Sequence, residues 1–367
     1  MSKSSPTLAS RAASLLGMRY AADFHSLTLV ALYFVTTWFM WTRGDSLGVF
    51  WYPAWVVMTY LSFSGAIMTH NTMHCAVFRT ASANKVFQVL LTLMYGHPVS
   101  SYVPGHNLSH HKHTETPKDL MRTTKMRYRW NLLNLLLFHF TVAGSVLRSD
   151  VRYLQIQREL RRPFFYNCMR EFFVLMAVQL VLLPLDWRKF LVLWYLPHFL
   201  AQYCIVTINL LQHGGTDVAS QETLETILTT TRCFTGSVTN FLCLNNGYHT
   251  IHHLRPYLHW SLCKEAHEKE IAPHLDPRLD EPNMITYIWR SYIYPGRRVD
   301  FRGNPVTFDG PEPEDEMWVE PPEGVTEEQV RPTLGNFVKT VVAALPALPL
   351  IPFKLMSPLY SPVHKLE

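Results

Sequence analysis

The sequence predicts an all-α integral membrane protein, and three observations support this prediction. Of the 367 residues, 48% are hydrophobic and only 17% are charged. Two stretches, 25–69 and 172–211, are nearly free of charge, whereas 104–130, 148–170 and 254–335 are strongly polar. Half of the 18 histidines fall into four short groups near the ends of the apolar stretches. Together these features favour a helical membrane part that carries a polar, histidine-rich part on one side.

Four segments are expected to cross the bilayer as two hairpins, since a helix needs about 20 apolar residues to span the hydrocarbon. Residues 25–41 and 49–69 are joined by TRGDSLG, and residues 172–185 and 190–211 by DWRK. Basic residues gather in the N-terminal tail, in 70–130 and in 148–170, with few at the hairpin tips. The positive-inside rule therefore places the termini and both large loops on the cytoplasmic or equivalent face.

Two further apolar stretches, 86–103 and 131–147, contain Gly or polar interruptions and have basic residues at both ends. We interpret them as interfacial or half-inserted helices; two additional full spans are the alternative.

The remaining segments are expected to lie outside the bilayer. Residues 1–24 form a basic tail, for which an organelle transit peptide is the alternative. Residues 263–308 read as a cytosolic extension of the membrane domain at 25–262. Residues 309–328 are acidic and Pro-rich, which predicts a loose linker. The segment 309–367 ends in an apolar, Pro-broken tail that is too short to span, and it would either graze the membrane or cover the cytosolic domain.

The histidine groups are the strongest functional signal. They occur in HNTMH (70–74), HNLSHH (106–111), NLLQHGG (209–215) and HTIHH (249–253). A spacing of three or four residues puts side chains on one helical face, and the expected topology puts all four groups on one side of the membrane. The nine candidate ligands are His70, His74, His106, His110, His111, His213, His249, His252 and His253.

Nine imidazoles are too many ligands for one four- to six-coordinate ion and suit two. Neutral imidazole binds zinc, iron, copper and nickel. The six cysteines form no CxxC pair and are expected to be reduced, and neither HExxH nor a Glu-x-x-His repeat is present. An all-histidine pair of sites at the membrane surface indicates iron that handles dioxygen.

The four motifs, with the continuation HHLRPYLHW, resemble those of the membrane fatty acid desaturase superfamily, which includes alkane hydroxylases and carotenoid ketolases. The resemblance covers roughly residues 25–262. It implies a non-haem di-iron enzyme with about four spans beneath a cytosolic cap, the nine histidines being the iron ligands. The middle motif is HxxxHH where many desaturases show HxxHH, and HHKHTETPKD is similar to alkane hydroxylases, so the exact reaction stays open.

The resemblance leads us to expect a fatty acid (acyl-lipid) desaturase that uses O2 and two electrons to introduce a double bond into a lipid chain drawn from the bilayer. A hydroxylase or ketolase acting on a lipid, alkane or carotenoid is the alternative. A metal transporter or a multi-haem cytochrome fits less well, because its ligands would lie within the spans. No nucleic-acid partner is expected.

Two groups of neighbouring residues are expected to assist the reaction, one in electron delivery and one in orienting the histidines. No flavin, nicotinamide or cytochrome b motif is present, so electrons are expected from a ferredoxin or a small b-type cytochrome with its reductase. Such a donor would dock on Arg122, Lys125, Arg127 and Arg129.

Polar side chains beside the motifs are expected to orient the imidazoles; they are Asn209, Gln212, Asn245, Asn246, Tyr248 and His113.

Overall fold

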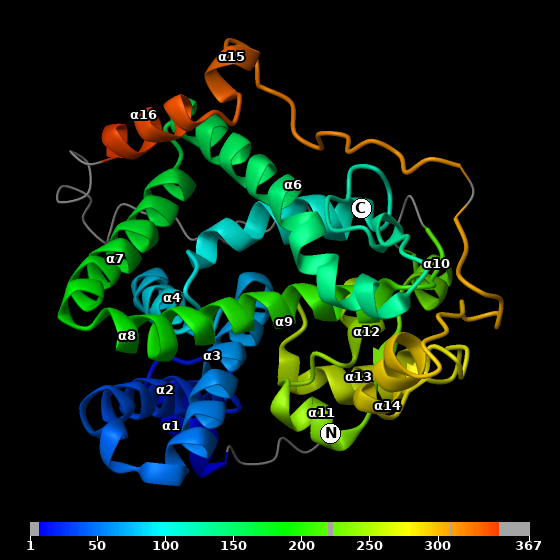
Figure 1. Ribbon diagram of the computed structural model, residues 1–367, viewed down its shortest axis with the longest axis horizontal. Coiled ribbons are helices and arrows are strands. Elements are labelled where there is room, and N and C mark those ends of the chain that lie inside the picture. Colours follow the sequence, from blue (N-terminus) through cyan, green and yellow to red (C-terminus); the bar gives the residue numbers. More distant parts are fainter. Residues whose placement is uncertain (1–6, 219–222, 309, 345–367) are drawn as a thin grey trace. The chain divides into compact units, whose positions relative to one another are not determined.

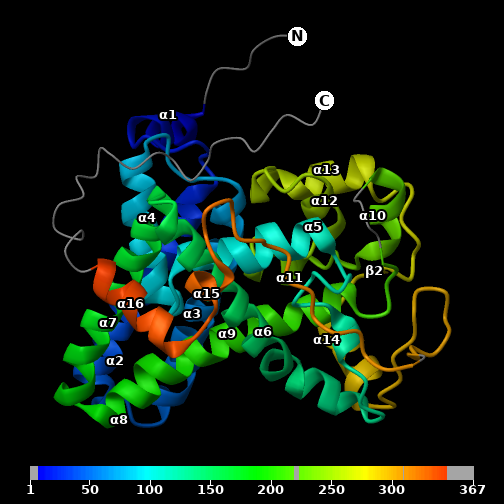
Figure 2. The same ribbon diagram turned by 90° about the horizontal axis from the view of Figure 1, so that it is seen from above.

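The computed structural model describes residues 7–218, 223–308 and 310–344, and these residues are predominantly helical (Figures 1 and 2). The chain divides into two compact units. Unit 1 comprises residues 1–101, 151–199 and 321–367, and unit 2 comprises 102–150 and 200–320. Among the described residues, the named strands are β1 (Cys233–Phe234) and β2 (Asp280–Glu281), which pair in parallel. The predicted all-α membrane fold is confirmed.

Unit 1 is built on long apolar helices. The short helices η1 (Gly44–Ser46) and η2 (Gly48–Phe50) join α2 (Asp23–Arg43) to α3 (Trp51–His74), and α2 and α3 pack together as the expected hairpin. The other helices of this unit are α1 (Leu8–Leu15), α4 (Ala81–Tyr95), η3 (Val99–Ser101), α7 (Pro163–Leu185), α8 (Trp187–Lys189), η6 (Phe190–Tyr195), α15 (Glu327–Val330) and α16 (Leu334–Ala344). Two more helices, α6 (Asn131–Glu159) and α9 (Leu196–His213), contribute to both units.

Close helix packing in unit 1 depends on two glycines. A Cβ on Gly65 of α3 would lie 2.8 Å from Cγ of Met94 on α4, so the missing side chain lets the two helices approach. Gly96 ends α4 in the left-handed conformation at φ 76°, and its Cα faces the imidazole of His198. Nε2 of His198 lies 2.8 Å from the hydroxyl of Tyr33. His198 is therefore a packing histidine of this unit.

In the described part of the chain, four helical segments are long and apolar enough to cross a membrane: Asp23–Ser46, Asn131–Glu159, Pro163–Leu185 and Trp187–His213. Three coincide with predicted spans. The fourth predicted span, 49–69, lies on α3, whose 24 residues include several hydroxyl side chains that lower its hydropathy. The fourth helix of the set is instead α6. It contains the stretch 131–147, for which the sequence favours an interfacial helix and a full span is the alternative. The stretch 86–103 does not form one helix, because α4 ends at Gly96.

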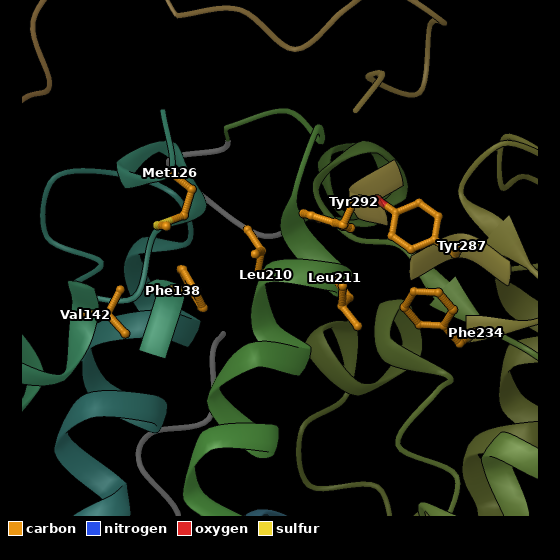
Figure 3. Packing of buried hydrophobic residues seen from close by; sticks show 8 residues of the cluster. All are labelled: Met126, Phe138, Val142, Leu210, Leu211, Phe234, Tyr287 and Tyr292. Carbon is orange, nitrogen blue, oxygen red and sulfur yellow. The ribbon is translucent and has the colours of Figure 1, made fainter. Parts of the chain in front are cut away.

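Unit 2 carries short helices around a mixed core. They are η4 (Val103–His110), α5 (His111–His113), η5 (Thr123–Lys125), α10 (Leu224–Thr230), α11 (Ser237–Leu242), α12 (His249–Leu254), η7 (Trp260–Leu262), α13 (Cys263–Glu270), α14 (Met284–Ile288) and η8 (Trp289–Ile293). Figure 3 shows one buried cluster, in which Leu210 and Leu211 of α9 lie among Phe138, Phe234 and other apolar side chains. Leu211 lies two residues before His213, the last residue of α9, so this cluster fixes the end of that helix.

Candidate metal centre

Four buried histidines of unit 2 form a compact group. The ligand atoms of His110, His213, His249 and His253 all lie within 4.8 Å of one another. None of the four side chains is more than 3% exposed. Four such imidazoles lie close enough together to hold a single metal ion.

Each of these histidines stands at the end of a structural element. His110 ends η4, a short π-helix, and His213 is the last residue of α9. His249 and His253 are the first and fifth residues of α12, so they occupy the same helical face. Three segments that are distant in the sequence thus supply the group.

The turn before α12 is tightly constrained. Leu244 and Asn245 adopt positive φ angles of 46° and 58°. A Cβ on Gly247 would lie 2.1 Å from the carbonyl oxygen of Phe234, a contact that no side chain tolerates. The Asn240 side chain accepts a hydrogen bond from the Gly247 amide and donates one to the Phe234 carbonyl. The sequence NNG therefore sets where His249 begins its helix.

Hydrogen bonds at Nδ1 define the tautomers of two of the four imidazoles. Nδ1 of His213 donates to the carbonyl oxygen of Thr230 at 2.9 Å, and a carbonyl is an acceptor only. Nδ1 of His110 lies 2.9 Å from Oδ2 of Asp119, and both side chains are fully buried. In the neutral imidazoles, Nε2 then carries a lone pair in both residues, which is the form that binds a metal.

The Nε2 atoms face one another. Nε2 of His249 lies 2.8 Å from Nε2 of His213 and 3.1 Å from Nε2 of His253. Burial, together with the neighbouring imidazoles, lowers the pKa of His253 well below its ordinary value, so this residue is neutral at pH 7. One cation would accept all these lone pairs at once, and an all-imidazole donor set suits iron as well as zinc or copper.

A second set of histidines lies in the same unit. Nε2 of His111 is 3.1 Å from Nε2 of His106 and 3.1 Å from Nε2 of His252. The rings of His111 and His253 stack with centroids 4.2 Å apart. Unit 2 therefore brings seven of the nine predicted ligands into one neighbourhood.

The remaining two predicted ligands belong to unit 1. His70 and His74 stand on the last turn of α3, with ring centroids 5.4 Å apart and both side chains buried. Nδ1 of His70 lies 3.1 Å from Oδ1 of Asn71. Their i, i+4 spacing gives the shared face that the sequence predicts.

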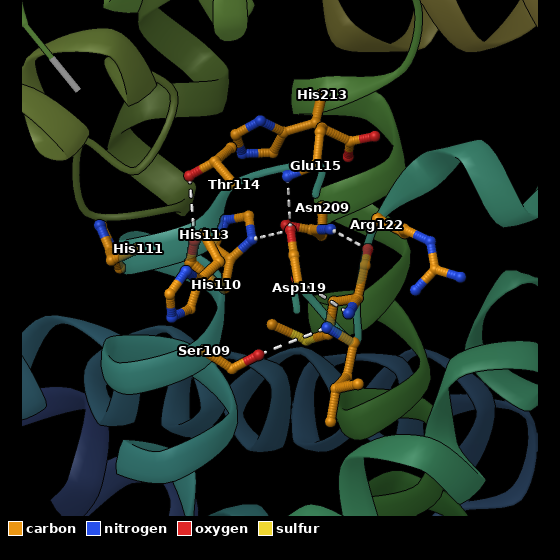
Figure 4. Close-up of polar contacts among 12 residues, drawn as sticks. Ser109, His110, His111, His113, Thr114, Glu115, Asp119, Arg122, Asn209 and His213 are labelled. Atoms are coloured by element: carbon orange, nitrogen blue, oxygen red, sulfur yellow. Dashed lines mark hydrogen bonds and ion pairs between the residues drawn. The ribbon is translucent and has the colours of Figure 1, made fainter. Parts of the chain in front are cut away.

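The loop after α5 carries two buried carboxylates, Glu115 and Asp119, whose roles were not predicted, and Asp119 supports His110 (Figure 4). Asp119 accepts hydrogen bonds from the backbone amides of Glu115 and Met121 as well as from His110. Burial opposes ionisation, yet His110 and these hydrogen bonds lower the pKa of Asp119. The sequence signal that could have revealed this support is the pair of acidic residues in HHKHTETPKD, the stretch that begins with the last two histidines of the motif.

Glu115 differs from Asp119 in its electrostatics. Its carboxylate accepts from the amide and the hydroxyl of Thr123 at 2.8 and 2.9 Å. Burial and the charge of Asp119 nevertheless raise the pKa of Glu115 to about 7. Two adjacent buried carboxyl groups with opposite pKa shifts thus lie beside the ligand loop.

The predicted orienting residues connect the loops around the histidines. Side-chain amides of three of them donate to main-chain carbonyls: Asn209 to Met121, Gln212 to Asn246, and Asn245 to Trp260. Tyr248 is buried, with its ring 5.1 Å from that of His267. The carbonyl of His113 accepts from Thr116. Direct orientation of an imidazole by any of the six stays a prediction.

Two of the four predicted docking cations are buried, and docking of a donor on any of the four stays a prediction. Arg122 and Lys125 are 1% and 7% exposed, and both form ion pairs with Asp315. Nη1 of Arg127 donates to the carbonyl of Gly310. Arg129 is exposed, as expected. The acidic segment expected to be a loose linker covers the buried pair.

The four membrane-length helices and the buried histidine group define an integral membrane protein with a site able to hold a metal ion. The family model described as fatty acid desaturase matches residues 49–282, which is more than half of the chain and includes all nine histidines. The chain therefore belongs to the fatty acid desaturase family and is an oxidoreductase. No curated protein and no solved structure gives a significant match.

Proposed function

We propose that this protein is an acyl-lipid desaturase with a non-haem di-iron centre. The observation that carries the proposal is the group of four buried imidazoles with ligand atoms within 4.8 Å, in a chain of the fatty acid desaturase family. His110, His213, His249 and His253 would hold one iron. The resemblance assigns His70, His74, His106, His111 and His252 to the rest of the centre. When bound, the irons would supply the dioxygen activation that amino-acid side chains lack.

The chemistry balances with an external electron source. Two hydrogen atoms leave neighbouring methylene carbons of the acyl chain and a carbon–carbon double bond forms. Two electrons and two protons from outside the substrate complete the reduction of O2 to two molecules of water. We assign the electrons to a small external redox protein, a ferredoxin or a b-type cytochrome.

The chain's own residues would prepare the site. Asp119 and the Thr230 carbonyl each hold one Nδ1–H, which directs Nε2 toward the metal. Burial lowers the pKa values of His213 and His253 and so keeps these two imidazoles neutral, and it shields all four rings from bulk water. The ligands His74 and His213 lie at the last residues of α3 and α9. We infer that the centre lies at the cytoplasmic or equivalent membrane face, where a lipid chain enters from the bilayer.

The test combines metal analysis with product analysis. Protein reconstituted without oxygen should hold close to two irons per chain, and the lipids of an expressing host should gain a double bond. His213→Ala should abolish both, whereas His267→Ala, at a buried histidine outside the group, should abolish neither. A new hydroxyl group would instead favour the hydroxylase alternative, and protein that binds no iron would refute the proposal.

A further inference from the structure

Residues 310–318, here named the acidic strap, lie over the loop that follows the HNLSHH motif. The strap has no helix or strand, and its sequence GPEPEDEMW carries four carboxylates. Both the strap and the loop belong to unit 2. The strap begins beyond residue 282, where the match to the desaturase family ends.

Carboxylates of the strap neutralise one buried guanidinium. Arg122 forms ion pairs with Asp315 and Glu312, the latter at 3.2 Å, and Nη2 also donates to the Pro313 carbonyl at 2.5 Å. The Arg122 side chain is 1% exposed, whereas those of Glu312 and Asp315 are 38% and 28% exposed. The strap is therefore the outer partner, and it covers the cation.

Asp315 also binds a second cation and a helix. Nζ of Lys125 lies 2.8 Å from Oδ1 of Asp315, and the hydroxyl of Ser145 on α6 donates to Oδ2 at 2.6 Å. These contacts lower the pKa of Asp315 despite its partial burial, so it is ionised at neutral pH. Farther along, the indole of Trp318 donates to the hydroxyl of Ser149 at 2.6 Å. Two cations and the Ser145 hydroxyl thus form a site for carboxylates, and the Ser149 hydroxyl holds the indole.

The strap is held mainly by charge. Residues 310–316 are exposed, and the half-buried residues 317 and 318 are the part of the strap with apolar cover. A segment that buries little apolar surface opens at low free-energy cost. Partly exposed ion pairs are also weakened by salt and open to competition from another anion.

The covered cations lie next to the residues that support the metal site. The amide of Arg122 donates to the carbonyl of Asp119, the residue that holds His110. Arg122 follows Asp119 by three positions in the chain. A redox partner bound at this position would stand close to the ligand loop, which is where electron delivery requires it.

We propose that Arg122 and Lys125 form the docking site for an acidic electron-donor protein, and that the strap carboxylates occupy this site until the donor displaces them. The inference rests on the proposed function, which requires an external donor. The strap itself shows which chemistry this site binds. Two carboxylates of a Pro-rich loop, three positions apart in the chain, pair with one guanidinium and one ammonium group. A negatively charged face of a small iron–sulfur protein offers the same groups.

The experiment uses the full chain and a plant-type [2Fe–2S] ferredoxin as the acidic probe. The variant Glu312→Gln/Asp315→Asn removes the strap charges, and Glu320→Gln/Glu323→Gln is the control with the same loss of charge at exposed positions. Hydrogen exchange of residues 119–125 and 310–318 reports whether the strap is released. Ferredoxin binding is measured at low and high salt, without turnover.

The strap variant should exchange faster at 310–318 and bind ferredoxin about fivefold or more tightly at low salt, with the gain lost at high salt. The control should match the unmodified protein. Lys125→Gln added to the strap variant should cancel the gain.

Unchanged exchange would show that charge does not hold the strap, and unchanged ferredoxin binding after release would overturn the docking site. Release that increases binding to vesicles with anionic lipids, but not to ferredoxin, would also overturn it. Neither measurement depends on iron content or lipid products, so failure of the proposed function is recognised separately.

Discussion

Nδ1 of His110 and Oδ2 of Asp119 lie 2.9 Å apart with both side chains fully buried. The histidine comes from a motif that the spacing identifies, and the carboxylate comes from the loop nine residues later. Such a carboxylate fixes the ring orientation and raises the basicity of Nε2.

Asp119→Asn should weaken metal binding without preventing folding. Asparagine keeps the shape but removes the charge that stabilises Nδ1–H of His110. We expect the affinity for iron to fall roughly 10–100-fold, measured by competition with a chelator. Asp276→Asn, at a carboxylate paired with the exposed Arg278, is the matched control. Equal affinities in the two variants would contradict the role of Asp119.

His213→Ala and His267→Ala should separate a ligand from a packing histidine. Both side chains are buried, but His267 packs against Tyr248, outside the group of four. We expect His213→Ala to lose at least one metal per chain, since removing one of four ligands opens the site. His267→Ala should retain its metal and show mainly a lower thermal midpoint. Elemental analysis of the two purified variants measures the difference.

Glu115 should make stability fall as pH rises toward neutrality. Its folded pKa of about 7 lies above its ordinary value of 4.5 because of burial and the charge of Asp119. Between these two values the folded state holds the proton more strongly than the unfolded state does. Stability from this group is therefore greatest below the unfolded pKa and is lost as pH rises through the folded pKa.

Comparison with Glu115→Gln measures this contribution. The thermal midpoint of the unmodified protein should decline by about 3 °C per pH unit relative to the variant between pH 5 and 7. Parallel pH profiles for the two proteins would show that Glu115 does not titrate in this range.

Gly247→Ala should disrupt the α12 histidines. The added Cβ would meet the Phe234 carbonyl at 2.1 Å and Oδ1 of Asn240 at 2.7 Å, so the turn before His249 must move. We expect destabilisation of about 2 kcal/mol or more, together with loss of bound metal. Gly335→Ala in α16 is the control, because a Cβ there meets nothing within 4 Å and alanine favours the helix. Thermal midpoints and metal content distinguish the pair.

The histidine group could be predicted from the sequence because it depends on spacings between residues that are close together in the chain. The i, i+4 spacing of His249 and His253 survives in α12, and His213 ends α9 where the apolar run stops. The helical membrane part was likewise predictable from long apolar runs. The role of α6 was harder to predict, since residues 148–159 are polar and concealed the length of one continuous helix.

The supporting residues could not be predicted because they depend on tertiary contacts. Asp119 meets His110 only after Glu115 adopts a positive φ of 61° and the loop turns back. Composition marked the strap as a loose linker, because it is acidic and Pro-rich. Composition does not show that Asp315 has a buried partner at Arg122, 193 residues earlier in the chain.

That sequence separation has a consequence for biosynthesis. During translation, the loop with Arg122 leaves the ribosome long before Asp315 is made, and His213, His249 and His253 also follow the loop. Contacts between such distant segments form late, because closing a long loop costs entropy before any contact offsets it. Arg122 and Lys125 therefore have no Asp315 to pair with until most of the polypeptide has been made.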